Sequence, residues 1–203
     1  VVREKVTLEA AGEEVRVRLG EEVQSFDAVV LSSGAWVKEL IEPLGYYVDV
    51  RPQKGQLIEL TLETTEDTSK WPVCMLHGEI DILPFPDGKI LVGATHENTQ
   101  GFDLVPDEEL LNGMYEEACA SLPSLKNAKR SGVRVGTRAY TSDFLPFFGE
   151  VPNTTNAFVA SGLGSSGLTS GVWIGELLAR MAAGEEVGFS VEKYTPQNYV
   201  RKV

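Results

Sequence analysis

Alternating apolar and polar residues near the start of the chain predict an antiparallel hairpin. Residues 3–9 and 14–19 alternate on either side of Ala11-Gly12, where a glycine allows a tight turn. The next apolar run, residues 26–31, has a continuous apolar centre. Such a run is typical of a strand that is buried on both faces.

A strand-to-helix connection follows this run. Residues 32–36 read Ser-Ser-Gly-Ala-Trp, and residues 37–42 have the pattern of one short helix. Pro43 and Gly45 are typical of its end, because proline cannot continue a helix and glycine favours the position after it.

The residue pattern in the middle of the chain is typical of an antiparallel sheet. Residues 56–62 alternate well, and residues 132–140 form another strand-like segment. Residues 75–83 and 89–94 flank Pro86-Asp87-Gly88, which has the composition of a type I or type II turn. We therefore expect a second hairpin here.

One longer helix is predicted over residues 106–122. Pro106 is expected to start it, and acidic residues fill its first turn. The apolar residues recur at helical spacing, which predicts a stripe that packs on the sheet. The stripe consists of Leu110, Leu111, Met114, Tyr115, Ala118 and Leu122.

The last third reads as a strand, a glycine-rich loop, an apolar helix and a polar tail. Together with the strand-to-helix turn near the start, this predicts a discontinuous α/β portion that flanks an inserted α+β portion. The fold class is therefore α+β, with a mostly antiparallel sheet, helices and partial pieces of an α/β domain.

Composition and charge exclude several kinds of protein. The 203 residues carry a net charge of -12, which argues against binding to nucleic acid as the main task. Cys74 and Cys119 have no metal-ligand spacing, so neither a zinc site nor a disulfide framework is expected. No apolar run approaches about 20 residues and no signal peptide is visible, which favours a cytoplasmic protein. Because the chain begins with Val-Val, we expect a piece of something longer.

Two neighbouring features could bind a ligand. Arg138 ends a strand-like segment, and its guanidinium could hold a carboxylate bidentately or pair with Asp143. The loop of residues 161–167, Ser-Gly-Leu-Gly-Ser-Ser-Gly, opens onto an apolar helix. Its three glycines exceed what a helix start needs, and the backbone N–H groups there could face an anion or an electron-rich ring.

Other candidates carry weaker signals. The turn at residues 32–36 is either a plain connection or a cofactor contact at the end of a parallel strand. His77 and His96 are expected at the surface or in structural hydrogen bonds, and Lys54 alone would be a surface charge. Glu97 and Asp103 suggest a loop cap rather than an acid/base pair. No catalytic side chain and no metal ligand set is predicted.

Five segments, taken in order, resemble one known family. The flavin-dependent amine oxidoreductases of the D-amino-acid oxidase superfamily share this order, especially the glycine oxidase, sarcosine oxidase and D-amino-acid dehydrogenase branch. Two positions depart from the common pattern, since Ala139 replaces a frequent proline and Phe144 a frequent glycine. The five segments are residues 26–36, 51–56, 90–103, 136–149 and 162–169.

The resemblance implies FAD as the cofactor and three segments with different tasks. Residues 1–44 and 141–203 would be parts of an FAD-binding domain, and residues 45–140 a substrate-binding domain. In the family, a first strand, a glycine-rich turn and a first helix at the N-terminus hold the FAD pyrophosphate, whereas this chain opens at the family's later hairpin. The resemblance therefore implies a missing N-terminal half and poor retention of FAD by the chain alone.

The resemblance also assigns roles to individual residues. Arg138 would bind the substrate carboxylate, and Tyr140 and His77 would face the substrate pocket. Ser33, Gly34 and Lys54 would lie near the cofactor. The glycine-rich loop would approach the isoalloxazine ring and direct a helix N-terminus at it. This loop consists of Gly162, Leu163, Gly164, Ser165, Ser166, Gly167, Leu168 and Thr169.

The implied activity is oxidation of the C–N bond of a small amino acid, such as glycine, sarcosine or a D-amino acid, to an imino acid. One alternative keeps FAD but oxidises a 2-hydroxy acid or a glycerol phosphate. Another is that the isolated chain is a non-catalytic, substrate-binding fragment. The expected partner is a small amine or amino acid.

Overall fold

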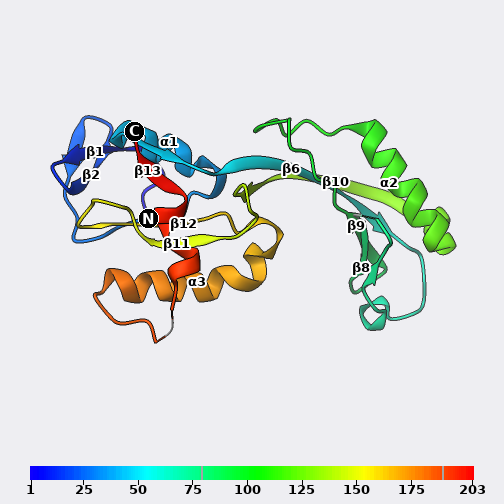
Figure 1. Cartoon of the computed structure of the whole chain (residues 1–203). Coiled ribbons are helices and arrows are strands. Elements are labelled where there is room, and N and C mark those ends of the chain that lie inside the picture. The colour runs from blue at the N-terminus through cyan, green and yellow to red at the C-terminus, as the bar shows by residue number, and fades with distance from the viewer. Residues whose placement is uncertain (79, 189) are drawn as a thin grey trace. The chain divides into compact units, whose positions relative to one another are not determined.

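The computed structural model describes residues 1–78, 80–188 and 190–203. The chain forms two compact units, which are described separately (Figure 1). Unit 1 contains Val1–Pro52 and Arg138–Val203, and unit 2 contains Gln53–Thr137. The mixed architecture, with mainly antiparallel sheets, confirms the predicted α+β class.

The first predicted hairpin is present in unit 1. Strands β1 (Val6–Ala11) and β2 (Glu14–Leu19) pair antiparallel, with Ala11 opposite Glu14 next to the turn. A third strand, β3 (Glu22–Gln24), pairs with β2 and was not predicted. Its three residues are all exposed, so they carry no hydrophobic alternation that the sequence could have shown.

A parallel strand pair lies at the centre of unit 1. Strand β4 (Val29–Leu31) pairs parallel with β12 (Ala157–Ser161), which pairs antiparallel with β11 (Phe147–Glu150). Strand β4 is shorter than the strand predicted over residues 26–31. The expectation of burial on both faces was wrong, because Val30 is 46% exposed on this edge strand.

The chain then turns through a composite helix into a second strand pair. This helix consists of η1 (Gly34–Trp36), α1 (Val37–Ile41) and η2 (Glu42–Leu44). It ends at Gly45, whose φ is 83°, as the sequence predicted, but Pro43 lies inside its last 3-10 turn and does not end it. Strand β5 (Tyr46–Val48) follows and pairs with β13 (Val200–Lys202) from the tail. The tail was expected to be merely polar, so β13 corrects that description.

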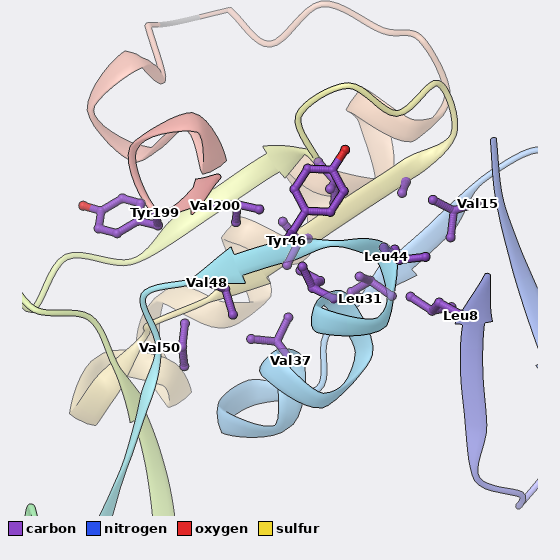
Figure 2. Close-up of a cluster of buried hydrophobic side chains, with 14 of the residues drawn as sticks. Leu8, Val15, Leu31, Val37, Leu44, Tyr46, Val48, Val50, Tyr199 and Val200 are labelled. Atoms are coloured by element: carbon purple, nitrogen blue, oxygen red, sulfur yellow. The ribbon is translucent and has the colours of Figure 1, made fainter. Parts of the chain in front are cut away.

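Two apolar clusters hold unit 1 together. One packs α1, β5 and β13 against the central strands, and Figure 2 shows Val37, Val48 and Val200 within it. The other packs α3 (Gly167–Ala182) through Ile174 and Leu177 against Phe148 and Phe158 of β11 and β12. The two clusters lie on opposite faces of the central sheet, since successive strand residues point to opposite sides.

Unit 2 is built on a sheet with the strand order β10-β6-β9-β8-β7. The long strands β6 (Arg51–Thr61) and β10 (Lys129–Tyr140) cross the boundary with unit 1. The segment predicted as one strand over residues 75–83 is instead two, and Glu79 within it lies outside the described residues. The other strands are β7 (Cys74–Met75), β8 (Asp81–Pro84) and β9 (Lys89–Gly93).

The turn between β8 and β9 differs from the predicted type. Asp87 and Gly88 both have positive φ, 59° and 71°, which is the pattern of a type I′ turn rather than type I or II. A type I′ turn suits a hairpin because its twist matches the right-handed twist of the strands. Composition alone did not separate these turn types.

Helix α2 (Glu108–Ser121) covers one face of the unit 2 sheet. Asp107, not Pro106, begins it, because the Asp107 side chain accepts hydrogen bonds from the N–H groups of Glu109 and Leu110. Leu111, Met114 and Ala118 of the predicted stripe are buried, but Leu110 is 43% exposed. The remaining short helices outside the candidate site are η3 (Thr68–Lys70), η4 (Pro123–Asn127), η6 (Glu192–Tyr194) and η7 (Pro196–Asn198).

Candidate functional site

Unit 1 makes the same strand-to-helix turn twice. After β4 and after β12, two residues lead into a 3-10 turn that begins with a glycine, and an α-helix follows. Gly34 and Gly164, the two glycines, have φ values of 57° and 55°. Trp36 (φ -82°, ψ 0°) and Ser166 (φ -87°, ψ 3°) then precede the helices with nearly equal angles. The second 3-10 turn is η5 (Gly164–Ser166).

The two turns lie at the same edge of the sheet. Strands β4 and β12 are parallel neighbours, so their carboxyl ends meet there, which is where open α/β sheets bind ligands. The Ser161 hydroxyl donates a hydrogen bond of 2.9 Å to the carbonyl oxygen of Gly34 and joins the turns. The buried Ser33 hydroxyl at this edge has no hydrogen-bond partner among the described residues. A polar edge of this kind is suited to a polar ligand.

The N-terminus of α3 is open to an acceptor. No side chain caps it. The Ser166 hydroxyl donates to the carbonyl of Leu163 at 2.8 Å, and those of Thr169 and Ser170 donate to the carbonyl of Ser166 at 2.9 and 2.8 Å. These three hydroxyl groups thus donate their hydrogen bonds to carbonyl oxygens. The first N–H groups of a helix lack intrahelical partners, so the N–H groups at the start of α3 can donate hydrogen bonds to a ligand.

The glycines of this loop differ in their surroundings. A Cβ at Gly162 would lie 2.8 Å from Cγ2 of Thr141, so Gly162 is required by packing within the protein. A Cβ at Gly164 would lie 4.0 Å from the carbonyl oxygen of Ala139, and one at Gly34 would meet no described atom within 4 Å. Open space therefore lies beside Gly34 and Gly164, where a ligand could approach the backbone.

The other predicted loop residues differ in their exposure. Leu163 packs against the apolar cluster under α3, so its side chain serves the fold. Ser165, Ser166, Leu168 and Thr169 are exposed, and Leu168 is 97% exposed. Gly167 is the first residue of α3.

Arg138 and Tyr140 lie at the end of β10, and both belong to unit 1. Arg138 is half-buried, and Tyr140 is buried. The Tyr140 ring stacks on Phe144 with centroids 5.5 Å apart, and the Arg51 guanidinium lies 5.7 Å from its centroid. Phe144 has a φ of 63°, in the left-handed region that glycine favours. The replacement of a frequent glycine noted in the sequence thus coincides with an unusual backbone conformation.

Asp143 is held by several hydrogen bonds. Its carboxylate accepts from the Leu145 N–H at 3.1 Å, the Thr141 hydroxyl at 2.9 Å and the Tyr199 hydroxyl at 2.9 Å. Burial acts to raise the pKa of Asp143, but these hydrogen bonds together lower it below its usual value. Burial and the hydrogen bond to Asp143 raise the pKa of Tyr199 to about 12. This pair therefore stabilises the loop as carboxylate and neutral phenol.

Unit 2 contains Lys54 and His77, the other two predicted site residues. Lys54 is only 2% exposed, so the interpretation of a surface charge was wrong. Its ammonium donates to the carbonyl of Val105 at 2.5 Å and lies 3.8 Å from Glu97 and 3.7 Å from Asp103. These contacts connect the segment after β9 to β6. The proximity of Lys54 to a cofactor stays a prediction.

The cavity of unit 2 includes His96 in its lining but not His77. His77 is exposed between β7 and β8, and His96 is exposed after β9. A cavity of about 630 Å³ lies between the segment after β9 and α2. None of the predicted substrate residues lines it. Its lining consists of Ile80, Ala94, Thr95, His96, Glu97, Glu109, Leu110, Gly113, Met114 and Glu117.

The structure thus brings the two glycine turns together in unit 1, while Lys54 and His77 belong to unit 2. Sequence reasoning missed Ser161 as the link between the turns, because a buried serine in an apolar strand has no distinctive pattern. Among the described residues there is no cluster of His, Cys, Asp or Glu that could hold a metal ion. The helices in the described part of the chain are too short or too polar to cross a bilayer.

The two glycine turns lie at the carboxyl ends of parallel strands, which is where proteins with open α/β sheets bind their ligands. A family model described as FAD dependent oxidoreductase (DAO) matches residues 1–181. The chain therefore belongs to the DAO family of FAD-dependent oxidoreductases, which confirms the resemblance seen in the sequence.

Individual relatives agree with this assignment. An uncharacterised oxidoreductase of Bacillus subtilis, YurR, is 39% identical over 84% of this chain and 46% of its own length. The glycine oxidase of Pseudomonas aeruginosa is 31% identical over 84% of this chain and 45% of its own length. The crystal structure of iminodiacetate oxidase from Chelativorans sp. BNC1 matches with a TM-score of 0.90 and 32% identity. The match covers 96% of this chain and 53% of the iminodiacetate oxidase chain. This chain therefore spans about half the length of the relatives that it matches.

Proposed function

We propose that this chain is part of an FAD-dependent enzyme that oxidises the C–N bond of a small amino acid. The product would be an imino acid, which water hydrolyses to an oxo acid. The observation that carries the proposal is the doubled glycine turn, with the uncapped α3 N-terminus at the carboxyl edge of β4 and β12. Membership of the FAD-dependent family supports the cofactor, and relatives named glycine oxidase and iminodiacetate oxidase support the amine substrate.

The residues at this edge fit an FAD group. The Ser33 hydroxyl is buried and lacks a partner, so it can hydrogen-bond a polar atom of the cofactor. The backbone beside Gly34 and Gly164 is open, which allows close approach. We therefore propose Ser33, Gly34 and the loop of residues 164–169 as the cofactor contacts in this chain.

FAD, when bound, supplies the two-electron redox chemistry. The N–H groups at the start of α3 would stabilise negative charge, because the positive end of the helix dipole lies there. Arg138 would bind the substrate carboxylate and so fix the orientation of the amine-bearing carbon. This division of labour requires no nucleophilic side chain, in agreement with the absence of a catalytic triad or dyad in the sequence.

Anaerobic bleaching of the bound flavin tests the substrate class. The intact protein that contains this chain is mixed in turn with glycine, sarcosine, proline, D-alanine and lactate, and its flavin absorbance is recorded. We expect bleaching by at least one of the amino acids. Bleaching by lactate alone would replace the proposal with the 2-hydroxy-acid alternative.

Replacement of Arg138 tests its role. Arg138→Ala is expected to raise KM for a carboxylate-bearing substrate by at least tenfold, because a charge-assisted contact of about 1.5–3 kcal/mol is lost. Arg130→Ala is a suitable control, since Arg130 pairs with Glu108 in unit 2 at 3.0 Å. An unchanged KM in Arg138→Ala would remove Arg138 from the site.

The 203-residue chain alone is expected to bind FAD poorly, because it spans only about half the length of the relatives that it matches. Purification with a stoichiometric yellow chromophore would contradict this expectation. The cytoplasmic location also stays a prediction.

A further inference from the structure

The two-stranded ribbon of β5 and β13 in unit 1 presents a polar face away from the core. Tyr46, Val48 and Val200 are buried in the cluster that Figure 2 shows. Strand residues alternate between faces, so Tyr47 of β5 and Arg201 of β13, which pair directly, lie on the opposite face. The Asp49 N–H donates to the carbonyl of Tyr199 at 2.9 Å and extends the ribbon beyond the strand ends.

This face is hollowed by a cavity of about 400 Å³. Cavities of about 300–1,000 Å³ are the size that holds small molecules. Every residue of the lining belongs to unit 1. They are Tyr47, Asp49, Arg51, Ser142, Gln197, Asn198, Tyr199, Val200 and Arg201.

Both arginines of the cavity are held by aromatic rings. The Arg201 guanidinium lies 4.6 Å from the centroid of Tyr47, and that of Arg51 lies 5.7 Å from the centroid of Tyr140. Stacking on a ring fixes the plane of a guanidinium but leaves its N–H groups at the edge unused. The cavity therefore has oriented hydrogen-bond donors.

Neither guanidinium has a carboxylate partner in the described part of the chain. No ion pair or side-chain hydrogen bond of Arg51 or Arg201 occurs among the described residues, although acidic residues outnumber basic ones by 30 to 18 in the sequence. Other arginines of the chain do pair with carboxylates. They are Arg16, Arg18, Arg130, Arg134 and Arg180.

The acidic groups nearby are engaged by neutral donors. Asp49 is the single carboxylate among the lining residues, and its Oδ2 accepts hydrogen bonds from the N–H and the hydroxyl of Ser142. Asp143 accepts from the Tyr199 hydroxyl. With two guanidinium groups and one carboxylate, the lining has a formal charge of +1 in a chain of net charge -12.

We propose that this cavity binds a small molecule that carries an oxyanion, either a carboxylate or a phosphate. Arg51 and Arg201 supply the charge-assisted hydrogen bonds, which are strongest to these two groups. The side chains of Gln197 and Asn198 and the hydroxyl of Ser142 add polar lining. This site is built from a different part of unit 1 than the glycine turns, and it does not depend on the proposed oxidase function.

Titration of the 203-residue chain with two probes tests the site. Inorganic phosphate and succinate are added at constant ionic strength, and the Nε–Hε signals of the arginines are followed in ¹H–¹⁵N spectra. We expect saturable shifts of the Arg51 and Arg201 signals with at least one probe. A response to phosphate alone or succinate alone identifies the preferred oxyanion, and shifts that do not saturate, or that affect all arginines alike, overturn the proposal.

Matched variants separate a specific site from general surface charge. Arg51→Gln and Arg201→Gln are expected to weaken binding about tenfold or more, whereas Arg16→Gln, which removes a positive charge elsewhere in unit 1, should leave it unchanged. Arg201→Lys keeps the charge but loses the planar donor set, so it should also weaken binding. Equal weakening in Arg16→Gln would overturn the proposal. No flavin or amine is present, so the result is independent of the oxidase assay.

Discussion

Replacing Gly162 or Gly164 by alanine should have different effects on the stability of unit 1, because Gly162 is packed against other residues and Gly164 faces open space. Both glycines have positive φ, 74° and 55°, so alanine at either position adopts a left-handed conformation that costs about 1–2 kcal/mol. Only Gly162 faces packed atoms. Its added Cβ would lie 2.8 Å from Cγ2 of Thr141 and 3.1 Å from the carbonyl oxygen of Leu145.

Thr141 cannot easily move away from this added methyl group. Its side chain is fully buried, and its hydroxyl makes hydrogen bonds with Asp143 at 2.9 Å and with the Leu145 carbonyl at 2.7 Å. Overpacking of this kind costs about 1–3 kcal/mol beyond the backbone term. Gly162→Ala should therefore lower the free energy of unfolding of unit 1 by about 2–5 kcal/mol, and Gly164→Ala by about 1–2 kcal/mol.

Urea unfolding followed by tryptophan fluorescence measures the difference. Trp36 and Trp173 lie in unit 1, and Trp71 lies in unit 2, so a Trp71→Phe background makes the signal specific for unit 1. A lower midpoint with an unchanged m-value reports stability alone. Equal midpoints for the two alanine variants would refute the packing argument.

Three further predictions concern buried charge, pH and backbone strain. Glu97→Gln should destabilise unit 2 by about 3 kcal/mol in urea unfolding, because it leaves the Lys54 ammonium buried with less compensation. Stability from Asp143, whose pKa is lowered on folding, should be complete above about pH 4 and fall as the pH drops below it, as acid titration of the unfolding free energy would show. Stability from Tyr199, whose pKa is raised to about 12, should be complete below about pH 10 and fall between about pH 10 and pH 12. Phe144→Gly should raise the melting temperature of unit 1, because φ is 63° at this exposed position; a lower melting temperature would show that stacking on Tyr140 outweighs the strain.

The elements that the sequence predicted best are those with long or regular patterns. The hairpin of β1 and β2, the helix α2 and the strand, loop and helix of β12 and α3 all appear close to their predicted places. The short strands β3 and β13 were missed, because three residues are too few to show a period of two. The burial of Val30 was also misjudged, since the position of β4 at a sheet edge depends on strands far away in sequence.

In the candidate site, too, local patterns were predicted and contacts between distant segments were not. The glycine-rich loop is visible in the sequence because its residues are contiguous. The buried network around Lys54 is not, because Lys54, Glu97 and Asp103 come together only when the segment after β9 folds back on β6. A lysine in sequence looks like surface charge, and the burial of Lys54 depends on partners more than 40 residues away.

The pairing of β4 with β12 has a consequence for the order of folding during synthesis. Leu31 pairs with Val159, so the ribosome adds about 130 residues before β4 meets its partner. At about 5–20 residues per second, this takes roughly 6–26 seconds. Unit 2 lies entirely within this interval and can form its own core first. We therefore expect nascent chains that stop before residue 157 to contain a folded unit 2 and an incomplete, aggregation-prone unit 1.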